Sequence, residues 1–247
     1  TCIEPYSRLF ALNRKACCRM TNIAMIPARM GSQRLQKKNL APLKGVPLIV
    51  HAIRKCREAG VFDRIIVNSE HPDFGPIAQA EGVEFHQRPE ELGSNNATSE
   101  DFVTEFLKAN PCDRVFQVHS IAPLLTTAEV RDFVSAMIET DVDVLLSVVD
   151  DQLECLYHDE PVNFTFSEKT NSQDLDPVRK VSWSITGWRS ATFLAAKESG
   201  GCATYAGRRG VFPVNKMAGH VIKTEEDLRI AEALYDFVHQ GGSVEGD

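Results

Sequence analysis

Short apolar runs alternate along the chain with longer segments whose apolar residues recur at helical spacing. Strands are predicted at residues 22–27, 64–68, 83–86, 115–118 and 143–149. Helices are predicted at residues 47–58, 73–79, 99–108, 127–139 and 225–239. Strands that alternate in this way with helices are typical of βαβ units around a parallel sheet. The pattern therefore predicts an α/β fold.

The alternation stops between residues 150 and 188. Two β-prone pieces, 162–166 and 181–185, flank the polar stretch KTNSQDLDPVRK. We expect a small β insertion here that acts as a lid or as a dimer contact. Residues 1–21 are basic and carry only a four-residue apolar run, too short for a secretory signal. We therefore expect a poorly ordered N-terminal extension followed by one domain over residues 22–240.

Composition and charge narrow the classes of function. The chain has 247 residues, 43% of them hydrophobic, and a formal net charge of -7. An acidic balance argues against a nucleic-acid partner or a membrane surface, because such partners select a basic face. No apolar stretch approaches the roughly 20 residues of a membrane helix. The seven cysteines form no C-x-x-C pair, which favours a reducing cytoplasm over a disulfide framework.

One loop concentrates positive charge against this background. It is the stretch IPARMGSQRLQKKNL at residues 26–40, directly after the first predicted strand. Open α/β sheets bind ligands at the carboxyl ends of their strands. The loop lacks both the P-loop and the G-x-G-x-x-G pattern, but a glycine-serine turn among cations suits a polyphosphate. A basic loop that only faces water is the open alternative. Its turn and cationic residues are Arg29, Gly31, Ser32, Arg34 and Lys38.

The run A-R-x-G-S-x-R-x-x-x-K-N resembles the signature loop of the acylneuraminate cytidylyltransferase (CMP-sialic acid synthetase) family. GVPLIVHAI, AGVFDRIIVNSE, AEGVEFHQRPEELGSNNATSED and NSQDLDP are similar to further family segments, so the likeness spans residues 22–235. It implies a Rossmann-like nucleotide-diphospho-sugar transferase fold and a homodimer. The implied reaction transfers CMP from CTP to an α-keto acid sugar, a sialic acid or related nonulosonate, and releases pyrophosphate with help from Mg²⁺.

The resemblance also implies roles for single residues. Arg29 and Lys38 would hold the phosphates, and Gly31 and Ser32 would shape the turn. The full set implied to bind the nucleotide is Ala28, Arg29, Gly31, Ser32, Arg34, Lys38, Asn39, Arg88, Ser99 and His119. Two of them have structural alternatives, because Arg88 can pair with Glu90 or Glu91 and Ser99 can simply cap a helix.

The chain departs from the family where a metal is expected. A D-x-D-T stretch usually precedes the last helix of the family, and this chain reads Val221, Ile222, Lys223 and Thr224 there. Because Mg²⁺ needs oxygen ligands, that pair of ligands cannot form. The Kdo cytidylyltransferases carry another aspartate near the position of Ile121. The metal ligands are therefore unknown.

Two hypotheses follow from this departure. Lys223 can act as a catalytic cation together with Arg29 and Lys38, with a shifted metal held by other carboxylates. The carboxylates considered are Asp174, Asp176, Glu225 and Glu226. In the second hypothesis the chain keeps the fold and the nucleotide grip but has altered or lost the chemistry. His119 replaces a family glutamine and either bonds the base or sugar or is structural.

Acceptor residues are expected in the insertion. Arg179 has the bidentate geometry for a sugar carboxylate, and Gln173 and Asp174 are the other candidates. Trp183 and Trp188 either line an acyl pocket or pack in the core. A glycosyltransferase acting on another sugar would use the D-x-D of residues 141–143, which stands before its strand, and a nucleotide sensor is a non-enzymatic alternative. The sequence does not choose among sugars.

Overall fold

A seven-stranded sheet forms the centre of the molecule, in a computed structural model that describes residues 20–239. The extension expected over residues 1–21 lies almost wholly outside them. In spatial order the strands are β11 (Arg209–Pro213), β7 (Val144–Asp151), β10 (Val178–Arg189), β6 (Arg114–Val118), β1 (Asn22–Pro27), β4 (Arg64–Ser69) and β5 (Glu84–Gln87). β10 runs antiparallel to β6 and β7, and the other pairs are parallel. The predicted α/β fold with a mostly parallel sheet is confirmed.

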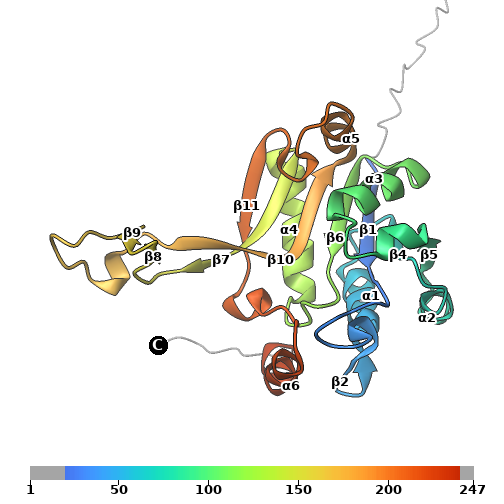
Figure 1. Cartoon of the computed structure of the whole chain (residues 1–247), viewed down its shortest axis with the longest axis horizontal. Coiled ribbons are helices and arrows are strands. Elements are labelled where there is room, and N and C mark those ends of the chain that lie inside the picture. Colours follow the sequence, from blue (N-terminus) through green and yellow to red (C-terminus); the bar gives the residue numbers. More distant parts are fainter. Residues whose placement is uncertain (1–19, 240–247) are drawn as a thin grey trace, which may run out of the picture.

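Helices cover both faces of the sheet (Figure 1). One face carries α1 (Leu48–Ala59), α2 (Phe74–Ala80) and α4 (Thr127–Thr140). The other carries α3 (Ser99–Ala109) and α5 (Ser190–Glu198). α6 (Glu225–His239) packs beyond the carboxyl ends of the strands, against the loop after β6. Within residues 20–239, no helix has the length and apolar character needed to cross a membrane.

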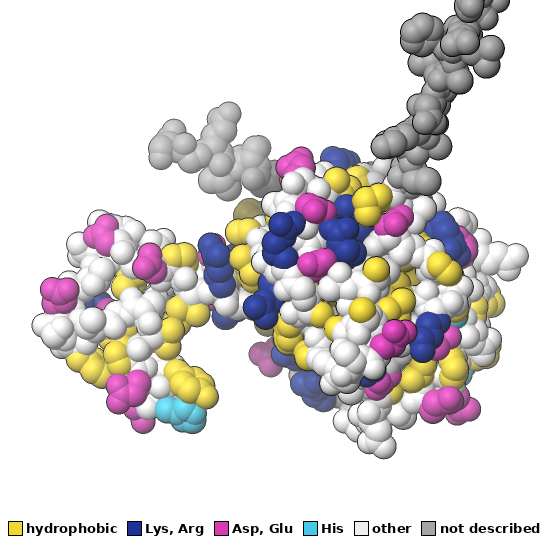
Figure 2. Space-filling view, turned by 90° about the horizontal axis from the view of Figure 1, so that it is seen from above, with side chains coloured by type: hydrophobic (Ala, Val, Ile, Leu, Met, Phe, Trp, Pro, Cys, Tyr) yellow, Lys and Arg dark blue, Asp and Glu magenta, His cyan; other side chains and the backbone are white. Residues whose placement is uncertain are grey.

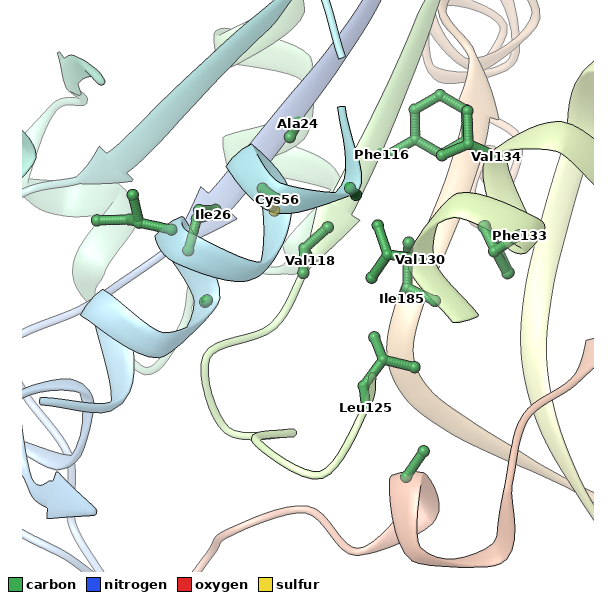
Figure 3. Close-up of a cluster of buried hydrophobic side chains, with 14 of the residues drawn as sticks. Ala24, Ile26, Cys56, Phe116, Val118, Leu125, Val130, Phe133, Val134 and Ile185 are labelled. Atoms are coloured by element: carbon green, nitrogen blue, oxygen red, sulfur yellow. The ribbon is translucent and has the colours of Figure 1, made fainter. Parts of the chain in front are cut away.

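The core follows from the alternation of side chains along buried strands. In β1, Ala24 and Ile26 point into the cluster under α1 and α4, while Ile23 and Met25 point into the cluster under α3 and α5. Figure 3 shows the first of these clusters. A strand covered on both faces reads as a continuous apolar run, which is why the sequence predicted β1 so clearly.

Helix ends match the local sequence signals. α3 and α4 begin with capping boxes in which Thr98 pairs with Asp101 and Thr126 with Glu129. The N-cap of α3 is therefore Thr98, and Ser99, whose alternative role was to cap a helix, is the first residue of α3. α1 ends at Gly60, whose φ of 67° is the left-handed conformation that glycine adopts without strain.

Three segments differ from the sequence predictions. The strand expected at residues 162–166 is wrong, because the nearest strand, β9 (Glu160–Pro161), ends before it. α5 and β11 were not predicted. α5 starts at the residue after β10 with no turn signal between them, and β11 is a short edge strand with exposed alternate positions. The remaining short strands are β2 (Pro42–Leu43), β3 (Val46–Pro47) and β8 (Leu156–Tyr157). Short 3-10 helices are η1 (Lys38–Leu40), η2 (Glu90–Gly93), η3 (Ser172–Asp174), η4 (Ala203–Tyr205) and η5 (Lys216–Gly219).

The insertion forms an arm that projects from the body (Figure 1). β7 and β10 extend as a pair beyond the other strands, and residues 152–177, which include β8 and β9, form the end of the arm. Figure 2 shows Lys and Arg side chains gathered where the arm meets the body. The predicted role of the insertion as a lid or dimer contact remains a prediction.

Gly187 lies in β10, the antiparallel strand, and a substitution there tests how tightly this strand is packed. A Cβ at Gly187 would lie 2.5 Å from Met137 Sδ and 2.9 Å from Phe116 Cε1, both in the buried core. We expect Gly187→Ala to lower the free energy of unfolding by about 1–3 kcal/mol, because the added methyl overpacks the core. Urea denaturation measures this. Gly31→Ala is the control, since its Cβ would meet no atom within 4 Å; equal losses in both variants would contradict the argument.

Candidate functional site

The carboxyl ends of four parallel strands meet at one edge of the sheet. The residues just beyond β1, β4, β5 and β6 are Ala28, Glu70, Arg88 and His119. The parallel ladder continues into the first of these loops, because Ala28 N–H donates to the carbonyl oxygen of Asn68 at 2.9 Å. Segments far apart in the sequence are thereby brought side by side.

A cavity of about 160 Å³ lies at this edge. Six of the residues predicted to bind a nucleotide line it, namely Ala28, Arg29, Lys38, Asn39, Arg88 and His119. The rest of its lining is Pro27, Phe102, Ser120 and Ile121. These six predicted residues therefore lie together around one cavity, and their contacts with a ligand remain predictions.

Lys38 is the cation at the centre of the cluster. Its half-buried ammonium lies at the start of η1. Burial lowers the pKa of Lys38, and the positive charges of Arg29, Arg34 and Lys223 lower it further, while Asp227 raises it. Three cations thus act on Lys38, an arrangement that a bound anion would stabilise.

Asn39 fixes the position of the cationic loop. Its side-chain amide Nδ2 donates to the carbonyl oxygen of Arg29 at 2.9 Å. Its Oδ1 accepts from the Ser120 hydroxyl at 2.7 Å. Asn39 is 6% exposed, so these bonds tie the loop after β1 to the loop after β6. A direct contact of Asn39 with a nucleotide remains a prediction.

Arg88 is buried at the back of the cavity. Its Nη2 pairs with Glu70 Oε2 at 3.0 Å, so its partner is neither Glu90 nor Glu91, the two carboxylates that the sequence suggested. The guanidinium carbon lies 4.8 Å from the ring centre of Phe102. Burial lowers the pKa of Arg88, and Glu70 opposes this change. The guanidinium therefore stays charged and oriented.

Glu70 is a site residue that the sequence reasoning missed. Its second oxygen, Oε1, accepts from Met30 N–H at 2.8 Å. One carboxylate thus holds both Arg88 and the backbone next to Arg29. Its position directly after β4 is the signal that could have found it, because that position is at the same edge as the cationic loop.

His119 lies between this cavity and a larger one. Its backbone N–H donates to the carbonyl oxygen of Ser184 at 3.1 Å. Burial, together with the positive charge of Lys38, lowers the pKa of His119 to about 4. The imidazole is therefore neutral near pH 7, with one ring nitrogen able to donate and the other to accept.

The second cavity, of about 560 Å³, shares His119 and Ile121 with the first. It runs along the N-terminal half of β10 to the segment before α6. The polar and aromatic residues that line it further are Lys180, Ser182, Trp183, Lys216, His220 and Lys223. Trp183 has a φ of 57° at an irregularity in the β7–β10 ladder, and such strained backbone is typical of ligand sites.

Several predicted site residues do not line either cavity. Gly31, Ser32 and Arg34 belong to the cationic loop but lie outside the first cavity. Ser99 is exposed in the first turn of α3. Gln173 and Asp174 lie on the arm, where the carbonyl oxygen of Gln173 accepts from Gln152 Nε2 at 2.8 Å. Their predicted roles remain predictions.

Arg179 also points away from the cavities in this chain. Its Nε pairs with Asp150 Oδ1 at 3.3 Å across the β7–β10 ladder. Adjacent residues of a strand face opposite sides, and the neighbour, Lys180, lines the second cavity. The cation that lines the second cavity is therefore Lys180, the residue after the predicted Arg179.

Two motifs with open interpretations are structural. Trp188 is 2% exposed and its Nε1 donates to the carbonyl oxygen of Thr204 at 3.0 Å, so it belongs to the core. Asp141 and Asp143 form the turn between α4 and β7, and both pair with Arg189. A glycosyltransferase D-x-D site at these aspartates is not supported.

Open α/β sheets commonly bind their ligands at the carboxyl ends of the strands, which is where this cationic cavity lies. The particular family follows from comparison with known sequences. The cytidylyltransferase family model matches residues 23–233, so the chain belongs to the cytidylyltransferase family. The resemblance found in the sequence is confirmed.

Similar sequences include three proteins named N-acylneuraminate cytidylyltransferase. The form A protein of Danio rerio is 27% identical over 186 residues, which cover 71% of this chain and 41% of that protein. The Streptococcus agalactiae serotype V protein is 28% identical over 197 residues, covering 76% and 48%. The Escherichia coli protein is 38% identical over 85 residues, covering 34% and 20%. The chain spans less than half the length of these curated relatives.

Similar solved structures show the same fold at low sequence identity. CMP:2-keto-3-deoxy-manno-octonic acid synthetase, complexed with CTP, gives a TM-score of 0.65 at 16% identity and covers 87% of this chain and 98% of that chain. The 4-diphosphocytidyl-2C-methyl-D-erythritol synthase of Anaerococcus prevotii gives 0.63 at 16% identity, covering 87% and 97%.

The low pKa of His119 has a consequence for stability. The usual pKa of histidine is 6.5, so the unfolded chain binds this proton first as the pH falls, and stability drops between pH 6.5 and about 4. Between pH 7 and pH 5, we expect His119→Gln to lose about 2 kcal/mol less free energy of unfolding than the wild type. Urea denaturation at both pH values measures this. Equal losses would show that His119 is not held neutral by the fold.

Proposed function

We propose that the protein transfers CMP from CTP to an acidic α-keto sugar, a sialic acid or related nonulosonate, and releases pyrophosphate. The observation that carries the proposal is the first cavity, which presents Arg29, Lys38 and Arg88 and, among residues 20–239, is lined by no Asp or Glu. The names of the relatives and the CTP bound to a solved structure of the same fold support the choice of nucleotide.

The triphosphate fits the first cavity. Arg29 and Lys38 reach it from the loop after β1, and Asn39 and Glu70 hold that loop in place. The neutral imidazole of His119 stands between the two cavities and offers a hydrogen bond to the base or the ribose. In this proposal the protein mainly positions the nucleotide and neutralises the negative charge of its phosphates.

The acidic acceptor fits the second cavity. Lys180 and Lys216 are cations suited to its carboxylate, and both pair with Asp151, which does not line the cavity. Gln173, Asp174 and Arg179 lie on the arm, so they contact an acceptor only where the arm of one chain meets another chain. The homodimer therefore remains part of this proposal.

The proposed reaction is an in-line displacement at the α-phosphorus of CTP. The anomeric hydroxyl oxygen of the sugar forms a bond to the α-phosphorus and releases its proton to water. The bond from the α-phosphorus to the bridging oxygen breaks, and its electron pair leaves with pyrophosphate. No covalent enzyme intermediate is needed.

A direct assay tests the proposal against its alternative, a nucleotide-binding homologue with altered chemistry. The protein is incubated with CTP and N-acetylneuraminate, with Mg²⁺ or with EDTA, and pyrophosphate is measured. Kdn, legionaminate and pseudaminate are tried as further acceptors, because the pocket chemistry does not choose among acyl groups. We expect pyrophosphate with at least one of them. CTP binding without pyrophosphate from any acceptor would favour the alternative.

Arg29 and Lys38 are tested separately by nucleotide binding. We expect Arg29→Ala or Lys38→Ala to leave no CTP binding measurable by calorimetry, because each variant removes a charge-assisted contact to the phosphates. Circular dichroism should stay unchanged. Lys37→Ala is the matched control, because Lys37 is an exposed neighbour outside both cavities. Unchanged affinity in Arg29→Ala and Lys38→Ala would reject the assignment.

A further inference from the structure

The two adjoining cavities contain cations without carboxylates. The charged side chains that line them are Arg29, Lys38, Arg88, Lys180, Lys216 and Lys223. In the part of the chain that the structure describes, neither lining includes an Asp or a Glu. Residues 20–239 also hold no group of three or more His, Cys, Asp or Glu side chains suited to a metal ion.

Mg²⁺, which the family resemblance implies, does not fit this set of donors. Ile222 N–H donates to the carbonyl oxygen of Ile121 at 2.8 Å, and the Ile222 side chain is fully buried beside α6. Its neighbours, Val221 and Lys223, face the second cavity instead. These are the positions of the two family aspartates. A methyl group and an ammonium supply no oxygen ligand to a hard cation.

The nearest carboxylates are already bound elsewhere. Asp227 Oδ2 accepts from the backbone N–H groups of Lys223 and Thr224, at 2.9 and 2.8 Å, where it caps α6. Asp151 is held by Lys180 and Lys216, and Glu70 by Arg88 and a backbone N–H. Both carboxylate oxygens of Glu70 and of Asp151 are used in these contacts, so recruiting either residue as a metal ligand would leave a backbone donor or a cation without its partner.

Other carboxylates considered from the sequence do not reach the cavities either. Asp174 and Asp176 are exposed on the arm. Glu225 pairs with Arg229 at 3.4 Å on the exposed side of α6, and Glu226 is exposed. A shifted metal site built from these residues is therefore not supported by the arrangement of the chain.

Lys38 lines the first cavity and Lys223 lines the second, and the two cavities adjoin at His119 and Ile121. Lys38 comes from the loop after β1, and Lys223 from the segment before α6. Their charges act on each other, because Lys223 contributes to the lowered pKa of Lys38. This repulsion is relieved when a polyanion enters between them.

We propose that Lys223 supplies the positive charge that a protein-bound metal would supply, so that the chain binds and uses the cytidine triphosphate without protein ligands to a divalent ion. The inference rests on the proposed function, since it assumes that this nucleotide enters the cleft. As the bond between the α-phosphorus and the bridging oxygen breaks, the electron pair and charge pass to pyrophosphate, which Arg29 and Lys38 neutralise in the first cavity, while Lys223 faces the transferred phosphoryl group from the second cavity. The metal-free nucleotide is the preferred ligand because it keeps its full negative charge.

Calorimetry of CTP binding in EDTA and in Mg²⁺ tests this inference without an activity readout. We expect the wild type to bind CTP in EDTA at least as tightly as in Mg²⁺. Lys223→Gln should weaken binding in EDTA by about tenfold, the effect of losing one charged hydrogen bond. In Lys223→Asp, Mg²⁺ should strengthen binding, because a carboxylate then faces the phosphates. Lys223 is exposed, so these variants should fold, which circular dichroism checks.

Lys37→Gln is the matched control, because it removes the same charge from a neighbouring surface outside both cavities. Its CTP affinity should equal that of the wild type. Wild-type binding that is about tenfold or more weaker in EDTA than in Mg²⁺ would overturn the inference and leave the proposed function standing. Wild-type affinity in Lys223→Gln would overturn it equally. Absence of CTP binding in both conditions would instead reject the proposed function and this inference with it.

Discussion

Separation of charge at the carboxyl edge of the sheet is the constraint on which the rest of this structure depends. The chain is acidic overall, yet the cleft presents cations alone. The nearby carboxylates Glu70, Asp151 and Asp227 are held in contacts of their own, and none of them lines the two cavities. Glu70, Asp151 and Asp227 each accept from a backbone N–H or a cation, so they hold the loops in position without entering the cavities. The contacts that hold the loops around the two cavities also keep these carboxylates out of the cavity linings, so the linings carry positive charge only.

Most of the fold was predictable because its signals are local. β1 is apolar throughout since both its faces are covered, and α3 carries its own capping box. α5 and β11 were missed for the opposite reason. α5 follows β10 without a break, and β11 is an exposed edge strand that pairs with β7 across about 65 residues of sequence. Tertiary pairing, not local preference, decides such a segment.

The same contrast between local signals and tertiary contacts applies to the residues of the candidate site. Arg29 and Lys38 were found because a cationic loop directly after the first strand has a clear meaning in an α/β sheet. Glu70, Lys180 and Lys216 were not found, since each reaches its partner, Arg88 for Glu70 and Asp151 for the two lysines, only through the tertiary fold. The choice of Arg179 over Lys180 shows the limit most sharply. Neighbours on a strand face opposite sides, and sequence alone did not fix which of the two faced the cleft.

The reversed strand has one more consequence. β10 is a single strand that begins on the arm and ends between β6 and β7, and it passes the second cavity at Trp183. One strand therefore connects the arm directly to the second cavity. The irregularity between Val181 and Thr186 interrupts the ladder just where the strand enters the body. A displacement of the arm would therefore act first on this irregular stretch, where Ser182 and Trp183 line the second cavity, before it reached the tightly packed Gly187 further along the strand.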